Sequence, residues 1–169
     1  MKKIICLAVF LAALFPASCG FTPMYGNHGA EGVSTQGKFQ QIRIASIPDR
    51  QGQILRNNLV DRLYHDGTPQ EPVYELSFAG IQSHSTALDI TPDSSSTRSE
   101  LRLLTEMRLK EISTGKILMS RNLIAVASYD VLGNEYTTLT TQESVRDDAL
   151  NDLAQQIETQ LALYFAHPQ

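Results

Sequence analysis

Apolar residues follow helical spacing in two segments of the chain. Over residues 49 to about 64, leucines recur every four positions, which predicts a helix with one buried stripe that Asp49 caps at its start. Over residues 141 to about 165 they recur every three or four positions, and Thr140 and Glu143 have the spacing of a capping box. The stripes consist of Leu55, Leu59 and Leu63 in the first helix, and of Leu150, Leu153, Ile157, Leu161 and Tyr164 in the second.

Four other segments have the pattern of strands. The second breaks at Gly80 and Ile81, which we interpret as a bulge, and residues 83–90 extend it. The third alternates leucines on one face with charged side chains on the other, apart from Leu104 on the charged face. The fourth is apolar throughout and is expected to be covered on both faces. These strands are predicted within residues 39–47, 73–83, 97–112 and 116–129.

The predicted order is β-α-β-β-β-α. Two amphipathic helices and a four-stranded sheet with an apolar face predict an α+β fold in which both helices pack on one face of the sheet. The helix between the first two strands allows them to run parallel, whereas the short connection Ser113–Gly115 makes a hairpin of the last two. The sheet is therefore expected to be mixed.

The N-terminus has the features of a secretory signal peptide. Lys2 and Lys3 precede the uncharged apolar run Ile4–Phe15, which is too short to span a bilayer as a helix. Small residues and Cys19 follow, and they resemble the cleavage site of a bacterial lipoprotein, with Pro16 where an aliphatic residue is usual. The chain is therefore divided into a signal peptide (1–18), a lipid anchor and flexible linker (19–37) and one α+β domain (38–169).

Lipidation would also explain an unpaired cysteine. Cys6 would leave with the signal peptide, so Cys19 would be the single cysteine of the mature chain and could form no internal disulfide. Acyl chains such as palmitate on Cys19 would hold the protein on a membrane. The alternative is ordinary signal cleavage nearby and a free secreted domain.

Charge argues against nucleic acid as a partner. Residues 1–18 contain two lysines and no acidic residue, so the remainder has 12 basic and 18 acidic residues. Nucleic-acid phosphates require a basic surface, which this balance does not favour.

The residues from Cys19 to Gly26 read Cys-Gly-Phe-Thr-Pro-Met-Tyr-Gly. This run resembles the opening of the LptE family of lipopolysaccharide-assembly lipoproteins, with Met24 in place of the usual leucine. The resemblance implies an outer-membrane lipoprotein of Gram-negative bacteria, anchored on the periplasmic side. It implies as partners lipopolysaccharide and the β-barrel that delivers it to the cell surface, which the lipoprotein plugs and helps to assemble. The alternative is a free-standing periplasmic lipoprotein with an apolar lipid pocket between helices and sheet.

Catalytic signatures are weak. The sequence has no nucleophile elbow, P-loop, dinucleotide-binding motif or CxxC pair, and its histidines lack metal-ligand spacing. Ser83, His84 and Ser85 are adjacent, but neighbouring strand residues point to opposite faces. We therefore expect no enzyme activity, no cofactor and no metal.

Basic residues concentrate in the hairpin of the last two predicted strands. Arg102, Arg108 and Lys110 share its polar face, and we expect them to contact the phosphates of lipopolysaccharide. The alternative is that interleaved glutamates form surface ion pairs with them. The cluster consists of Arg98, Arg102, Arg108, Lys110, Lys116 and Arg121, and the glutamates are Glu100, Glu106 and Glu111.

Overall fold

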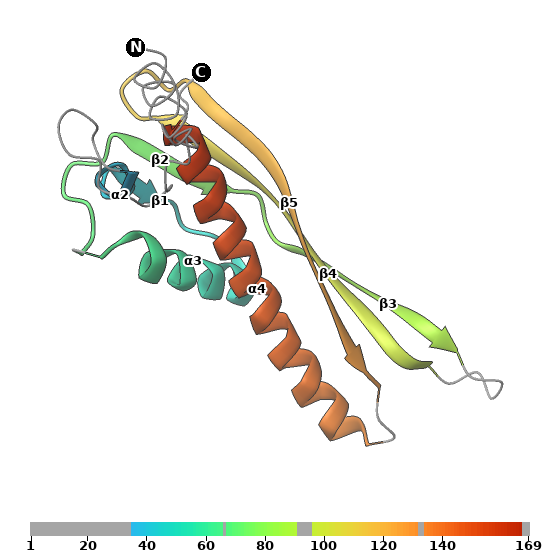
Figure 1. The fold of residues 1–169 in the computed structure, drawn as a ribbon. Helices are drawn as coiled ribbons and strands as arrows, with labels where there is room; N and C mark the ends of the chain where they lie inside the picture. The colour runs from blue at the N-terminus through green and yellow to red at the C-terminus, as the bar shows by residue number, and fades with distance from the viewer. Residues whose placement is uncertain (1–34, 66, 91–95, 132–133, 167–169) are drawn as a thin grey trace, which may run out of the picture.

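The computed structural model describes residues 35–65, 67–90, 96–131 and 134–166 (Figure 1). It confirms the α+β class, with helices packed on a mixed sheet. In chain order the elements are α2 (Thr35–Phe39), β1 (Ile42–Ile44), α3 (Asp49–Leu63), β2 (Tyr74–Phe78), β3 (Gln82–Ile90), β4 (Ser96–Glu111), β5 (Ile117–Asp130) and α4 (Glu135–Ala166).

The long strand β4 organises the sheet. Its neighbours are β5 along one edge and both β2 and β3 along the other, all antiparallel to it. β1 extends the sheet beyond β2 and runs parallel to it, as expected for strands joined by a helix. The five described strands are thus ordered β1-β2-β4-β3, with β5 on the other side of β4.

The predicted second strand is two strands, which is why five are described instead of four. β2 pairs with the end of β4 and β3 with its beginning, and the break falls at Gly80, where a bulge was predicted. The Ala79 amide still donates to the carbonyl of Glu106 at 2.9 Å, and the Thr105 hydroxyl donates to the carbonyl of Ala79 at 3.0 Å. Side-chain and main-chain bonds thus hold the chain against β4 across the break.

One face of the sheet packs against the helices. In Figure 1, α4 runs along β5, and α3 packs beside α4. The predicted leucine stripe of α3 is buried, and so is the apolar face of β4, because these residues fill the space between the two layers. The largest fully buried side chains are Phe39, Ile42, Leu55, Leu59, Leu63, Leu76, Leu101, Leu103, Met107, Leu109, Leu150 and Leu153.

The predicted caps of both long helices are wrong, although α3 does begin at Asp49 as expected. Pro48 occupies the N-cap of α3 without a side-chain cap, and Asp49 is the first helical residue with a φ of 66°, outside the extended conformation of a capping residue. α4 begins six residues before the predicted start because Asn134 caps it, accepting a hydrogen bond from the Tyr136 amide at 3.0 Å. Thr140 lies inside this helix and bonds back to its carbonyls, so it caps nothing.

The last residues of the predicted linker are helical. Residues 35–37 belong to α2, and the rest of the linker and Cys19 lie outside the described residues. Phe39 ends α2, is 2 % exposed and packs edge-on against Phe165 of α4, with the ring centroids 6.5 Å apart. Burial of this ring ties the entry of the chain to the end of α4.

β5 is not covered on both faces, which corrects the prediction. Its burial alternates, so that Leu123 and Ala125 lie under α4 while Ile124 and Val126 point away and are 50 % and 53 % exposed. Both long helices lie on one side of the sheet. The apolar sequence of β5 therefore did not mean that the opposite side of this strand is covered. We call this uncovered side of β1, β2, β4, β5 and β3 the open face.

Candidate functional site

The three basic residues predicted to bind lipopolysaccharide all lie on the open face. Arg102 is opposite Val126 of β5, Arg108 is opposite Ser120, and Lys110 is opposite Glu75 of β2. Arg102 and Arg108 are six residues apart on one strand, or about 20 Å at the usual rise of a strand. The fold therefore places them in one row along β4.

Arg108 forms the best-defined ion pair of this row. Its Nε and Nη2 each donate to a carboxylate oxygen of Glu106 at 2.8 Å, two residues earlier on the strand. The Ser120 hydroxyl donates a further hydrogen bond of 2.8 Å to Glu106. Such two-pronged pairing fixes the plane of the guanidinium group.

The other two predicted contacts also have carboxylate partners. Arg102 Nε donates to Glu100 at 2.5 Å, and Lys110 Nζ lies 2.8 Å from an oxygen of Glu75. Glu75 also pairs with Arg43 of β1. Interleaved glutamates of β4 thus pair with Arg102 and Arg108, as the predicted alternative described. The partner of Lys110 is Glu75 of β2, which was not among the glutamates predicted.

These contacts shift the titration of the glutamates. Hydrogen bonds from Lys110 and then Arg43 lower the pKa of Glu75 below its ordinary value. Hydrogen bonds from Arg108 and then Ser120 lower the pKa of Glu106, and Glu106 in turn raises the pKa of Arg108. The charged forms of Glu75, Glu106 and Arg108 are thus favoured.

A hollow with an apolar floor and polar side chains at its edge lies on the open face, in the part of β4 between Arg102 and Arg108. It has a volume of about 410 Å³ and opens where β2 breaks away from β3, with Leu104 and Ile124 paired across its floor. Val126 continues this apolar strip toward Arg102. Leu104 was a partial signal for this hollow, because it is the one apolar residue on the charged face of β4, but the exposure of Ile124 and Val126 was not predicted.

The serines beside His84 do not face its imidazole. Ser83 and Ser85 pair with the helix-facing side of β4, whereas His84 pairs with Arg102 on the open face. The Ser85 hydroxyl is instead within 3.1 Å of the Tyr129 hydroxyl. Among the described residues, no three His, Cys, Asp or Glu side chains are grouped so that they could hold a metal ion.

The family comparison agrees with the N-terminal resemblance. The family model described as "LptE: Lipopolysaccharide-assembly" matches residues 39–161, a region that does not include the Cys19–Gly26 motif. The chain belongs to the LptE family. Searching curated proteins by sequence returned no match.

Several solved structures that this chain resembles are described as lipoproteins. A lipoprotein from Caulobacter crescentus has a TM-score of 0.63 at 21% identity and covers 79% of this chain and 96% of its own. Rare lipoprotein B from Shewanella oneidensis has a TM-score of 0.60 at 12% identity, covering 75% and 95%. Lipoprotein B from Nitrosomonas europaea has a TM-score of 0.57 at 15% identity, covering 75% and 83%. At these identities the likeness shows the fold alone.

No helix in the described part of the chain combines the length and hydropathy needed to cross a membrane.

Proposed function

We propose that this LptE-family chain is a non-enzymatic outer-membrane lipoprotein, anchored through Cys19 on the periplasmic side. It plugs and helps to assemble the β-barrel that delivers lipopolysaccharide to the cell surface. The observation that carries this proposal is the match to the lipopolysaccharide-assembly family over residues 39–161. The open face supplies the chemistry that such a role requires.

The open face suits an amphiphile with several phosphates. Arg102 and Arg108 present planar guanidinium groups, which recognise phosphate through paired hydrogen bonds. The hollow over Leu104 and Ile124 offers apolar surface between them. Lipopolysaccharide combines phosphates with acyl chains, so both parts of the molecule find a matching surface.

The glutamate partners of the arginines affect how a phosphate can bind them. Glu100 and Glu106 hold the two arginines in place before a ligand arrives. A phosphate must share or replace these carboxylates, so each contact is an exchange of one anion for another. Exchange of this kind makes binding reversible, which suits a protein that passes lipopolysaccharide on.

The same face suits the lumen of a barrel. Barrel interiors are polar and hydrated, and a plug must present polar groups whose hydrogen bonds can be satisfied. Ser77, Ser120 and Asn122 accompany the charged row on this face. The free-standing lipid-binding alternative gains less support, because packed side chains such as Leu103 and Leu153 fill the centre of the described layer between helices and sheet.

A mild-detergent pulldown from the native envelope tests the proposal. Tagged full-length protein should recover a large β-barrel protein together with lipopolysaccharide. The Cys19→Ala variant, expressed to the same level, should recover much less barrel because it lacks the lipid that brings it to the outer membrane. Recovery of correctly localised wild-type protein without a barrel would contradict the proposal.

A further inference from the structure

One end of the domain combines exposed apolar side chains with cations. This end, where β4 turns into β5, we call the turn end. The Ile112 amide donates to the carbonyl of Val73, and Ile117 pairs with Lys110, so the strand ends meet there. Large apolar side chains are exposed at this end by 37–55 %; they are Val73, Ile112, Ile117 and Leu163.

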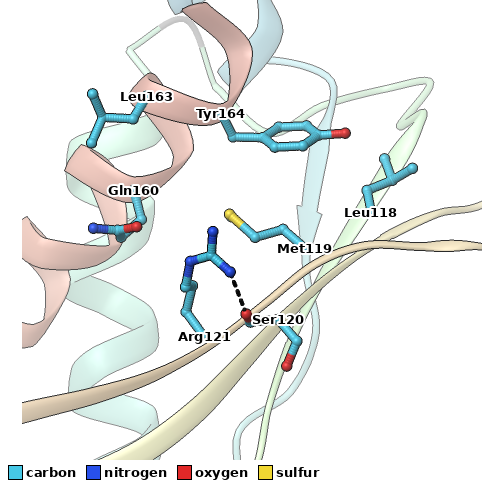
Figure 2. A pocket seen from close by; sticks show the side chains of 7 residues that line it. All are labelled: Leu118, Met119, Ser120, Arg121, Gln160, Leu163 and Tyr164. Carbon is cyan, nitrogen blue, oxygen red and sulfur yellow. Dashed lines mark hydrogen bonds between the residues drawn. The ribbon is translucent and has the colours of Figure 1, made fainter. Parts of the chain in front are cut away.

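A hollow at the turn end lies between β5 and the last turns of α4. Its volume is about 380 Å³, within the range of ligand sites. Figure 2 shows the guanidinium group of Arg121 pointing into it, with Met119 beside it and Gln160 and Tyr164 across from it. Leu118 and Leu163 supply apolar surface at the rim.

Arg121 differs from the arginines of the open face. Its Nη1 donates to the carbonyl of Ser120 at 3.0 Å, which orients the group but does not neutralise it. Within the described residues, neither Arg121 nor Lys116 of the adjoining turn has a carboxylate in ion-pair distance, whereas Arg102 and Arg108 each have one. The turn end thus carries positive charge available to an external anion.

The chain enters the domain beside this hollow. α2 is fixed by contact of Phe39 with Phe165, whose ring also lies 5.3 Å from that of Tyr164. Fifteen residues separate Cys19 from Thr35, and the linker predicted there from the sequence would span about 20 Å. An anchor on Cys19 would therefore keep the turn end close to the bilayer.

We propose that the turn end rests on the membrane surface and that its hollow binds the phosphate of an anionic phospholipid, with Arg121 as the phosphate contact. Exposed apolar residues next to cations are typical of surfaces that lie in the membrane interface. Tyr164 has the amphipathic ring that favours the level of lipid headgroups. This inference depends on the lipid anchor but not on the barrel or on lipopolysaccharide binding to the open face.

Methyl NMR of the full chain in nanodiscs tests the inference. Met119 reports on the hollow, Ile124 on the open face, and buried Ile44 on the integrity of the fold. Replacing part of a phosphatidylcholine disc with phosphatidylglycerol should shift the Met119 signal and leave Ile44 unchanged. Arg121→Gln should weaken this response about tenfold or more, because a charge-assisted contact is lost. Arg50→Gln, at an exposed position of α3, is the matched control and should keep it.

The same measurement distinguishes the sources of phosphate and can overturn the inference. Inorganic phosphate added to pure phosphatidylcholine discs should not reproduce the Met119 shift; if it does, the hollow is a site for free phosphate. Absence of any shift with phosphatidylglycerol would refute binding at the hollow. An equal response in Arg121→Gln with an intact Ile44 signal would refute the role of Arg121.

Discussion

Arg108 and Glu106, two residues apart on β4, form a two-pronged ion pair on the open face of the sheet, with both contacts at 2.8 Å. Residues at this spacing share one face of a strand, so the pair is built by the pleat and needs no other element. It orients a guanidinium group toward solvent beside the apolar hollow. This relationship links the strand pattern in the sequence to the proposed contact with lipopolysaccharide.

The pair predicts a dependence of stability on pH. The contact with Arg108 lowers the pKa of Glu106 below its ordinary value of 4.5. A carboxylate whose pKa is lowered in the folded state stabilises the fold at pH values above its ordinary pKa. This contribution to stability is lost as the pH falls through the lowered pKa. Urea unfolding at several pH values should show Glu106→Gln less stable than wild type at pH 7, with the difference shrinking below about pH 4.5. Glu71→Gln, at an exposed loop position, is the control; a pH-independent difference for Glu106→Gln would contradict the prediction.

Tyr64 closes the free side of β1. Its hydroxyl donates to the carbonyl of Ile42 at 2.7 Å and accepts from the amide of Ile44 at 3.1 Å. Tyr64→Phe leaves both backbone groups without this partner and should lower the free energy of unfolding by about 1–2 kcal/mol. Urea unfolding measures the change, and Tyr136→Phe, at a position 76 % exposed, should have almost no effect. Equal effects of the two substitutions would refute the role of Tyr64.

Gly52 is required by close packing inside α3. A Cβ atom there would lie 2.6 Å from Cγ2 of Ile47 and 2.9 Å from its Cβ. Gly52→Ala should therefore destabilise the protein by about 1–3 kcal/mol, even though alanine is the better helix former. Gly80→Ala places its Cβ in open space and should change the stability by less than about 0.5 kcal/mol. Thermal unfolding compares them, and a stabilised Gly52→Ala variant would contradict this packing.

The start of α4 can be tested by removing its cap. Asn134→Ala loses the bond to the Tyr136 amide and should lower the free energy of unfolding by about 1 kcal/mol. Thr140→Ala removes a hydroxyl that bonds back to helix carbonyls, so it should lower the free energy of unfolding by much less. Chemical unfolding measures both changes. A larger loss of stability for Thr140→Ala than for Asn134→Ala would instead place the cap at Thr140, where the sequence pattern predicted it.

The helix and strand patterns predicted the core because burial follows periodicity. Leu55, Leu59 and Leu63 are buried as their spacing indicated, and so are Leu101 and Leu103 on β4. The true start of α4 was missed because the threonine-rich turns after Asn134 have no apolar period to reveal a helix. Secondary-structure boundaries of this kind depend on hydrogen bonds that spacing does not encode.

The candidate site was predicted only in part, for a reason of tertiary structure. Alternation placed Arg102, Arg108 and Lys110 on one face, and the structure confirms that they share it. Which face of an apolar strand is covered depends on where a helix from elsewhere in the chain lies, so the exposure of Ile124 could not be read from β5 alone. The hollow at Arg121 has the same origin, since α4 forms one of its walls.

Affinity measurement with an open-face variant tests whether the open face binds lipopolysaccharide, as we propose. Full-length wild type is compared with Arg102→Glu/Arg108→Glu and with Arg50→Glu/Arg56→Glu, which makes the same change in charge on α3. We expect at least tenfold weaker lipopolysaccharide binding for the open-face variant, because two charge-assisted contacts are lost, and near wild-type binding for the α3 variant. Unchanged affinity in a folded open-face variant, or equal weakening in both variants, would contradict the claim.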